Sequence, residues 1–303
     1  MASRVPPPPS PRPDEILAMS PSEADRLLDA LEVTVPVHPP VVSLSARVGR
    51  EAVVFGDTHG DWRSTEEVVR LADDPTGPRV LIGLGDYVDR SPIDSENGSV
   101  ANALYLLARA ARSPDRVFLL EGNHETVAEI PAVPCTLPEE VDALWGPDET
   151  RYQRLAALLE RGPLALTTES GAYLAHGGFP RGALPPDWRT ALAWRTESRL
   201  IEVVWSECTE SRSRRGGIAP WTERELGTFL AATGLSIVLR GHDPELTGRT
   251  LYGGRCLTLQ TTRIYERYGG VIAALLPLDR PVRSVTDLAV RHLATEGRHY
   301  PAD

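Results

Sequence analysis

From residue 51 onward, short apolar runs alternate with longer stretches in which apolar residues recur every three or four positions. The runs at 52–55, 80–84 and 117–120 predict buried strands. The stretches at about 64–72 and 99–111 predict helices between them. Three consecutive β-α units predict a parallel sheet. In such sheets ligands bind at the carboxyl ends of the strands, so we expect the functional residues there.

The second half of the chain predicts another group of strands. Helical periodicity appears in the middle, from Pro138 to Arg161, and again at 222–232. Further strands are expected at 164–167, 173–175, 236–239, 250–252, 256–261 and 270–275, the last three as an antiparallel set. Strands on both sides of one core predict an α/β fold of the α+β sandwich type, with a central mixed β-sandwich flanked by helices.

The two ends of the chain differ from this pattern. Residues 1–14 contain six prolines and little that packs, which predicts a disordered tail. Residues 15–45 are expected to form a helix, from Ser20 through Leu31, and a proline-marked linker. We therefore place the main domain at 46–278 and a surface-packed C-terminal extension at 279–303.

Composition excludes several classes of protein. The net charge of −10 argues against broad nucleic-acid binding, which needs a basic surface. No apolar run reaches membrane-spanning length and the start lacks a secretory segment, so we expect a cytoplasmic protein without a membrane partner. The three cysteines are widely spaced, which excludes a disulfide scaffold and a cysteine-based zinc site.

Polar residues collect at the predicted strand ends, each beside a glycine. A single histidine in such a place is usually a capping or surface residue, but the joint pattern favours a site. Two carboxylates, a carboxamide and three imidazoles form a mixed oxygen and nitrogen donor set that suits Mn²⁺, Fe or Zn²⁺. This number of ligands fits two ions roughly 3.5–4 Å apart, the arrangement used to attack phosphorus. The residues are Asp57, His59, Asp86, Asn123, His176 and His242.

Five short motifs carry a family resemblance. In chain order they are Gly56-Asp57-Thr58-His59-Gly60, Gly85-Asp86-Tyr87-Val88-Asp89-Arg90, Gly122-Asn123-His124-Glu125, His176-Gly177-Gly178 and Arg240-Gly241-His242. Together they resemble the signature of the phosphoprotein phosphatase (PPP) family of calcineurin-like metallophosphoesterases. The match spans about residues 53–275, and its departures place the chain nearer the bacterial-type protein Ser/Thr phosphatases.

The resemblance implies two divalent metal ions, most simply Mn²⁺, with Fe or Zn as alternatives. The first ion would be held by Asp57, His59 and Asp86, and the second by Asp86, Asn123, His176 and His242. A hydroxide bridging the ions would attack phosphorus directly, without a phosphoenzyme.

The resemblance also assigns the proton transfer and the phosphate contacts. His124 matches the general acid, and Asp89 matches the residue that orients it. Arg90 matches the arginine that grips phosphate oxygens. A second such arginine is expected after Trp205-Ser206-Glu207, as Arg215 or, alternatively, Arg214.

Four positions fit the family pattern less well. Ser91 replaces a glycine, Glu121 stands where eukaryotic relatives carry arginine, and Glu207 replaces an aspartate. Tyr265 lies roughly where relatives place a tyrosine over the metals, but its surroundings match poorly, so we assign it no role. Glu125 is expected to brace its loop and not to bind metal.

The expected function is hydrolysis of phosphomonoesters on phosphorylated proteins or peptides, on Ser/Thr first and on Tyr as a further substrate. The alternative within the same chemistry is a small-molecule hydrolase of the diadenosine-tetraphosphatase type, because motifs do not fix the substrate. The other alternative is a non-enzymatic scaffold that binds phosphopeptides. Such a scaffold would purify without transition metal. It would normally have lost a metal ligand or the general acid, whereas this chain retains all of them.

Overall fold

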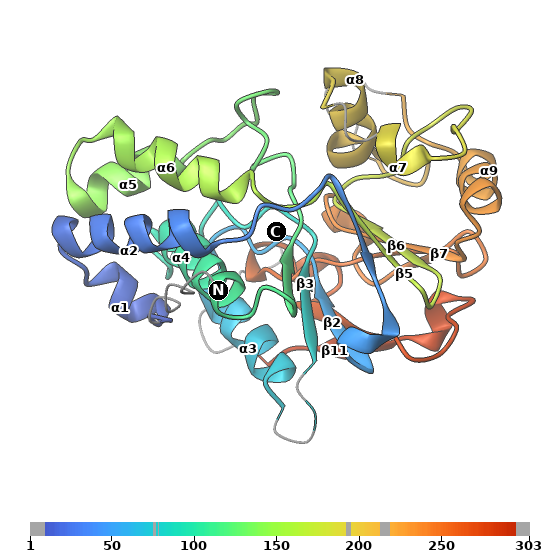
Figure 1. The fold of residues 1–303 in the computed structure, drawn as a ribbon, viewed down its shortest axis with the longest axis horizontal. Helices are drawn as coiled ribbons and strands as arrows, with labels where there is room; N and C mark the ends of the chain where they lie inside the picture. The colour runs from blue at the N-terminus through green and yellow to red at the C-terminus, as the bar shows by residue number, and fades with distance from the viewer. Residues whose placement is uncertain (1–9, 75–76, 78, 192–194, 213–218, 295–303) are drawn as a thin grey trace, which may run out of the picture.

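Two mixed β-sheets pack face to face in the structure, a computed structural model that describes residues 10–74, 77, 79–191, 195–212 and 219–294 (Figure 1). The six-stranded sheet has the order β1 (Val41–Leu44), β5 (Ala165–Thr168), β6 (Ala172–Ala175), β7 (Ile237–Arg240), β9 (Cys256–Thr258) and β8 (Thr250–Leu251). The five-stranded sheet has the order β11 (Ala289–His292), β10 (Ile272–Pro277), β2 (Glu51–Phe55), β3 (Val80–Gly83) and β4 (Val117–Leu119). The predicted mixed sandwich is confirmed.

The β-α units of the first half form as predicted, with β2, β3 and β4 parallel. The apolar run of strand β2 is continuous. Successive side chains of a strand face opposite sides of the sheet, so a continuous run places apolar side chains on both sides. Val53 and Phe55 pack into the core beneath the helices, whereas Ala52 and Val54 pack into the core between the two sheets. Both faces are therefore buried, which is the condition that produces unbroken apolar strands.

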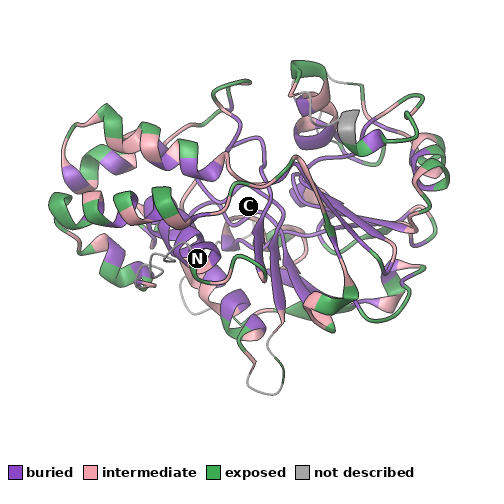
Figure 2. Ribbon diagram, viewed as in Figure 1, coloured by how far each residue is buried: buried purple, intermediate pink, exposed green. Residues whose placement is uncertain are grey.

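Helices cover the outer face of each sheet (Figure 1). The five-stranded sheet carries α3 (Trp62–Ala72) and α4 (Gly98–Arg112), and α4 is covered in turn by α1 (Pro13–Leu17), α2 (Pro21–Thr34), α5 (Leu137–Trp145) and α6 (Glu149–Leu159). The six-stranded sheet carries α7 (Trp188–Ala191), α8 (Glu197–Leu200), the π-helical turn η2 (Ile201–Trp205) and α9 (Glu223–Thr233). Short 3₁₀ turns are η1 (Ala46–Val48), η4 (Pro244–Leu246), η5 (Arg263–Tyr268) and η6 (Val285–Asp287). Figure 2 shows most strand residues buried and the outermost helices with exposed outer faces; the edge strand β11 is exposed along its length. Within the described residues, none of the helices has the length and apolar character needed to cross a membrane.

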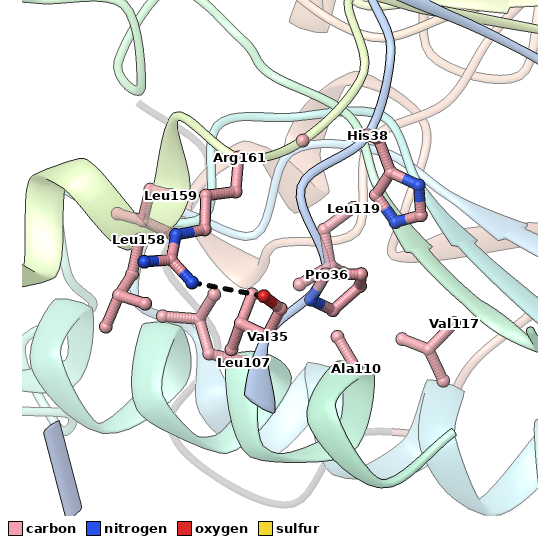
Figure 3. Close-up of a pocket in the computed structure, with 11 residues that line it drawn as sticks. Val35, Pro36, His38, Leu107, Ala110, Val117, Leu119, Leu158, Leu159 and Arg161 are labelled. Atoms are coloured by element: carbon pink, nitrogen blue, oxygen red, sulfur yellow. Dashed lines mark hydrogen bonds between the residues drawn. The ribbon is translucent and has the colours of Figure 1, made fainter. Parts of the chain in front are cut away.

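The joint between the N-terminal helices and α4 is closely packed. Figure 3 shows the hollow at this joint, where Arg161 donates to the carbonyl of Val35 at 3.1 Å. The walls come mainly from apolar side chains of α4, β4 and α6, and the hollow measures about 20 Å³. That volume holds about one water molecule, so this place is no substrate site.

Several strands differ from the expectations. Residues 41–44, expected as linker, form β1 and pair with β5, and Ala289–His292, in the expected surface extension, forms β11 on the edge of β10. Strand β10 lies antiparallel to β2 in the other sheet and not beside β9, and β9 is parallel to β7. Only β8 and β9 form the antiparallel pair expected there, because strand pairing depends on contacts far along the chain. Residues 13–14, expected in the tail, begin α1.

We predict that Leu28→Ala in α2 lowers the free energy of unfolding by about 2–5 kcal/mol, because a fully buried leucine leaves a cavity. Leu28 is 1% exposed, whereas Val33 on the same helix is 68% exposed. Urea denaturation of both variants measures the difference, with Val33→Ala expected to stay within about 0.5 kcal/mol of the parent. Equal losses in the two variants would contradict the packing described for α2.

Candidate active site

The loops that follow β2, β3, β4, β6 and β7 meet at one edge of the sandwich, because these strands end at the same side. They bring together all six predicted metal ligands and the predicted acid pair. None of the six side chains is more than 3% exposed: Asp57, His59, Asp86, Asn123, His176 and His242. The structure therefore assembles the predicted set in one buried place.

The backbone at this edge is strained where it presents the side chains. Non-glycine residues with left-handed φ include His59 at 45°, Asp86 at 57° and His242 at 68°. At two motif positions only glycine fits, because a carboxylate oxygen lies too close to the backbone for a side chain. A Cβ on Gly122 would lie 2.3 Å from Asp86 Oδ1, and one on Gly241 would lie 2.3 Å from Asp57 Oδ1. Such strain persists only where the surroundings impose it, which is typical of functional sites.

The first donor group consists of Asp57, His59 and Asp86. His59 Nε2 lies 3.9 Å from Asp57 Oδ2 and 3.7 Å from Asp86 Oδ2. His59 Nδ1 donates to the carbonyl of Val88 at 2.9 Å, which leaves the Nε2 lone pair facing the carboxylates. A carbonyl holding the far nitrogen is the usual support of a metal-ligating histidine. Gln260 also donates to Asp57 Oδ2, at 2.9 Å, and keeps that carboxylate in place.

The second donor group consists of Asp86, Asn123, His176 and His242. His176 Nε2 lies 3.0 Å from Asn123 Oδ1 and 3.3 Å from Asp86 Oδ2. His242 Nδ1 lies 2.9 Å from Asn123 Oδ1 and 3.2 Å from His176 Nε2. Since His176 Nδ1 gives its hydrogen to Leu84 O at 3.0 Å, Nε2 and the amide oxygen meet as two lone-pair donors. A divalent cation between these atoms fits the donor set.

Asp86 belongs to both donor groups, since its Oδ2 lies 3.7 Å from His59 Nε2 and 3.3 Å from His176 Nε2, so two cations would share its carboxylate. The electrostatics agree with this arrangement. Burial alone lowers the pKa of His176, but the carboxylates of Asp86 and Asp57 outweigh it and raise that pKa to about 9. The buried carboxylates thus attract positive charge, which a metal supplies when it displaces the proton. The residues present fit two divalent ions.

The predicted acid pair is also assembled. His124 Nδ1 donates to Asp89 Oδ2 at 2.5 Å, and Asp89 Oδ1 accepts from the amides of Thr136 and Leu137 at 2.6 and 2.9 Å. Burial lowers the pKa of His124, but the charge of Asp86 and the hydrogen bond to Asp89 outweigh it, so the net pKa is raised. His124 Nε2 is buried and has no hydrogen-bond partner among the described residues. This nitrogen is therefore available for a substrate oxygen.

Arg90 lies beside this pair, and the structure adds a neighbour that the sequence did not assign. Arg90 donates to the Tyr265 hydroxyl at 2.8 Å and to the Val133 carbonyl at 3.0 Å. The Tyr265 ring also meets the His59 ring edge-on at 5.8 Å between centroids. Tyr265 therefore belongs to the site, and only its approximate position along the chain pointed to it. Arg215 and its alternative Arg214 lie outside the described residues.

A layer of buried ionic contacts supports the site loops. Glu125 accepts from the amides of Asp86, Tyr87 and Gly122 at 2.7–2.8 Å, so it ties the loop after β4 to the loop after β3. Burial raises the pKa of Glu125 to about 7, with the charge of Asp86 acting in the same direction. This geometry agrees with the bracing role expected for Glu125.

The same layer contains two ion pairs that were not predicted from the sequence. Glu121, fully buried, takes a bidentate contact from Arg195 at 2.8 Å to each oxygen. Asp61, the N-cap of α3, is paired with the fully buried Arg263 at 2.8 Å. Each pair joins segments far apart in sequence, and no local motif marks such partners.

Comparisons with known proteins agree with this geometry. Residues 52–246, more than half of the chain, match the calcineurin-like phosphoesterase family. The chain is 26% identical over 247 residues to the serine/threonine-protein phosphatase 4 catalytic subunit of Saccharomyces cerevisiae, covering 77% of this chain and 76% of that protein. It is 25% identical over 276 residues to serine/threonine-protein phosphatase T of Trypanosoma brucei brucei, covering 86% of this chain but 57% of that protein. The resemblance inferred from the motifs is confirmed.

Solved structures show the same fold. A protein serine/threonine phosphatase from Saccharomyces cerevisiae, similar to human phosphatase PP5, superposes with a TM-score of 0.69 at 20% identity, covering 95% of this chain and 92% of that one. The cold-active protein-tyrosine phosphatase of a Shewanella species superposes with a TM-score of 0.54 at 14% identity, covering 86% and 84%. At these identities the likeness shows the fold alone, and it confirms the predicted sandwich.

We predict that Asp86→Asn weakens binding of divalent metal by at least about tenfold, because the substitution removes the one carboxylate shared by both donor groups. Metal content after dialysis against Mn²⁺, measured by elemental analysis, tests this. The matched control is Asp115→Asn, which changes an exposed aspartate and should leave metal content unchanged. Full metal content in Asp86→Asn would exclude the shared-carboxylate arrangement.

Proposed function

Because the chain belongs to the calcineurin-like phosphoesterase family, we propose that it is a metal-dependent protein phosphatase that hydrolyses phosphoserine and phosphothreonine in proteins or peptides. One observation carries this proposal: two donor groups that share Asp86 lie beside a buried histidine–aspartate pair, His124 and Asp89. This combination can activate water, hold phosphate and protonate a leaving oxygen. The names of the curated relatives support phosphoserine and phosphothreonine as the substrates.

Two divalent cations, with Mn²⁺ as our first candidate and Fe or Zn as alternatives, would supply Lewis-acid polarisation of the phosphoryl group and lower the pKa of the attacking water. Asp57 and His59 would hold one side of this centre, with Asp86 shared. Asn123, His176 and His242 would hold the other side. These assignments rest on the convergence of the donor atoms.

The remaining chemistry belongs to side chains of this chain. Arg90 presents a planar guanidinium, which suits paired hydrogen bonds to phosphoryl oxygens. His124 donates a proton from Nε2 to the serine or threonine oxygen as the P–O bond breaks. Asp89 holds Nδ1–H, so the transferable proton is on the nitrogen that faces the substrate. Arg215 remains our candidate for a second phosphate contact.

The test compares Mn²⁺-loaded and chelator-treated protein on phosphoserine, phosphothreonine and phosphotyrosine peptides and on diadenosine tetraphosphate. Metal-dependent phosphate release from the serine and threonine peptides, with the dinucleotide intact, is the expected result. Preferential cleavage of the dinucleotide would retain the metal centre and overturn the protein substrate. Inactivity on all four substrates would overturn the proposed function.

We predict that His124→Ala retains its metal but slows hydrolysis of phosphoserine peptides by about 10²–10⁴-fold, the usual contribution of a general acid. Aryl phosphates with acidic leaving groups need no proton, so their turnover should fall much less. Steady-state kinetics on both substrate classes and elemental analysis provide the readouts. Unchanged turnover of the poor leaving group would remove His124 from the mechanism.

We predict that Asp89→Asn moves the alkaline limb of the pH–rate profile for phosphoserine peptides to lower pH. Burial lowers the pKa of His124, whereas the charges of Asp86 and Asp89 raise it. Loss of the Asp89 charge therefore lowers that pKa, and the protonated acid disappears at lower pH as the pH rises. Profiles of kcat against pH for parent and variant measure the shift, with His124→Ala as the control that lacks this limb. An unmoved limb would show that Asp89 does not govern the acid.

A further inference from the structure

Asp89 and Arg90 occupy consecutive left-handed backbone positions, with φ of 63° and 56°. For residues with a side chain this conformation is unfavourable, because Cβ comes too close to the following carbonyl oxygen. It persists only when surrounding contacts over-determine it. Both residues act in the proposed reaction, so whatever holds this segment also sets the position of the acid pair.

Glu140, on the first turns of α5, lies at the centre of the contacts that hold the segment. One carboxylate oxygen accepts from the Ser99 hydroxyl at 2.7 Å, the Thr136 hydroxyl at 3.1 Å and the Ser91 hydroxyl at 3.2 Å. The other oxygen accepts from the Ser99 amide at 2.8 Å. Four protein donors fix this partly buried carboxylate in one orientation. If the carboxylate turned away, these donors would lose their acceptor, which costs free energy in a buried place.

Two routes lead from Glu140 to Asp89. The Ser99 hydroxyl donates to Glu140 and itself accepts from the Asp89 amide at 2.9 Å, so it fixes the strained backbone. Thr136, the N-cap of α5, contacts Glu140 through its hydroxyl and donates its amide to Asp89 Oδ1 at 2.6 Å, so it fixes the carboxylate. Glu140 therefore acts on the backbone and on the side chain of Asp89 at once.

Ser91 adds a link that a glycine at this position would lack. Its hydroxyl contacts Ser99 Oγ at 3.0 Å, accepts from the Ser99 amide at 3.0 Å and reaches Glu140. The residue that follows Arg90 is thereby tied to the start of α4. The departure from the family pattern at this position thus strengthens the same cluster.

We propose that Glu140 is a positioning residue of the phosphatase reaction: through Ser99 and Thr136 it holds Asp89, and through Asp89 it keeps His124 aligned for proton transfer to the leaving oxygen. The proposal rests on the proposed function, because it requires His124 to be the general acid. Glu140 itself touches neither substrate nor metal ligand.

The test is leaving-group dependence. We expect Glu140→Ala to lower kcat/KM for phosphate esters with poor leaving groups at least about tenfold more than for aryl phosphates with acidic leaving groups, a part of the contribution of a general acid. Glu140→Gln, which keeps the shape and one acceptor oxygen, should lie between Glu140→Ala and the parent. Metal content should equal that of the parent in both variants. Glu139→Ala is the matched control, because Glu139 lies on the same helix turn, carries the same charge and is exposed.

A purely structural role for Glu140 would lower the melting temperature and scale all substrates by one factor. That result, or an unchanged kcat/KM, would overturn the proposal. If Glu140→Ala fails to fold, Ser99→Ala breaks the route to the Asp89 amide and should show the same selective loss. His124→Ala in the same assay separates the two failures. Selective loss in His124→Ala alone rejects the role of Glu140, whereas no selective loss in His124→Ala rejects the proposed acid itself.

Discussion

The arrangement of the site depends on one electrostatic constraint: Asp57, Asp86 and Glu125 are carboxylates buried together, none of them more than 2% exposed. Buried charges of one sign repel one another and lose hydration, so they need positive charge or hydrogen-bond donors in fixed positions. Glu125 is satisfied by three backbone amides. Asp57 and Asp86 each accept from one backbone amide, those of His242 and His124, and both carboxylates also face imidazoles on the side where cations would lie. The left-handed residues and close-packed glycines of the loops follow from the need to place these groups so near one another.

Two ion pairs next to the site hold in place the loops that carry these carboxylates. Arg263 with Asp61 joins the turn η5 to the start of α3, and Arg195 with Glu121 joins the segment before α8 to the end of β4. A buried ion pair contributes little net stability compared with apolar packing, but removal of one partner is costly. Such pairs therefore fix where a loop lies more than they stabilise the fold, which suits a site whose loops come from five strands of two sheets.

Much of this was predictable from the sequence, because the signals are local. The runs at β2, β3 and β4 are continuous and apolar, and each ends in a polar motif that marks the site. Strand β1 was missed because its four residues directly follow Pro39-Pro40 in a segment that reads as a linker, and β11 because all of its residues are exposed. The placement of β10 beside β2, and the roles of Tyr265 and Arg195, depend on contacts between residues more than seventy positions apart. Periodicity and spacing carry no information about such partners.

The pairing of β2 with β10 has a consequence for how the protein is made. Ala52 lies opposite Leu276, and Val41 of β1 lies opposite Ala165 of β5. Contacts this distant in sequence give a high contact order, and they form late because a long loop must close first. During synthesis one edge of β2 can pair early with β3, but its other edge stays open until β10, more than two hundred residues further on, has been made. The loops after β2 and β7 carry donor residues 185 positions apart, so the full donor set exists only once His242 has been synthesised.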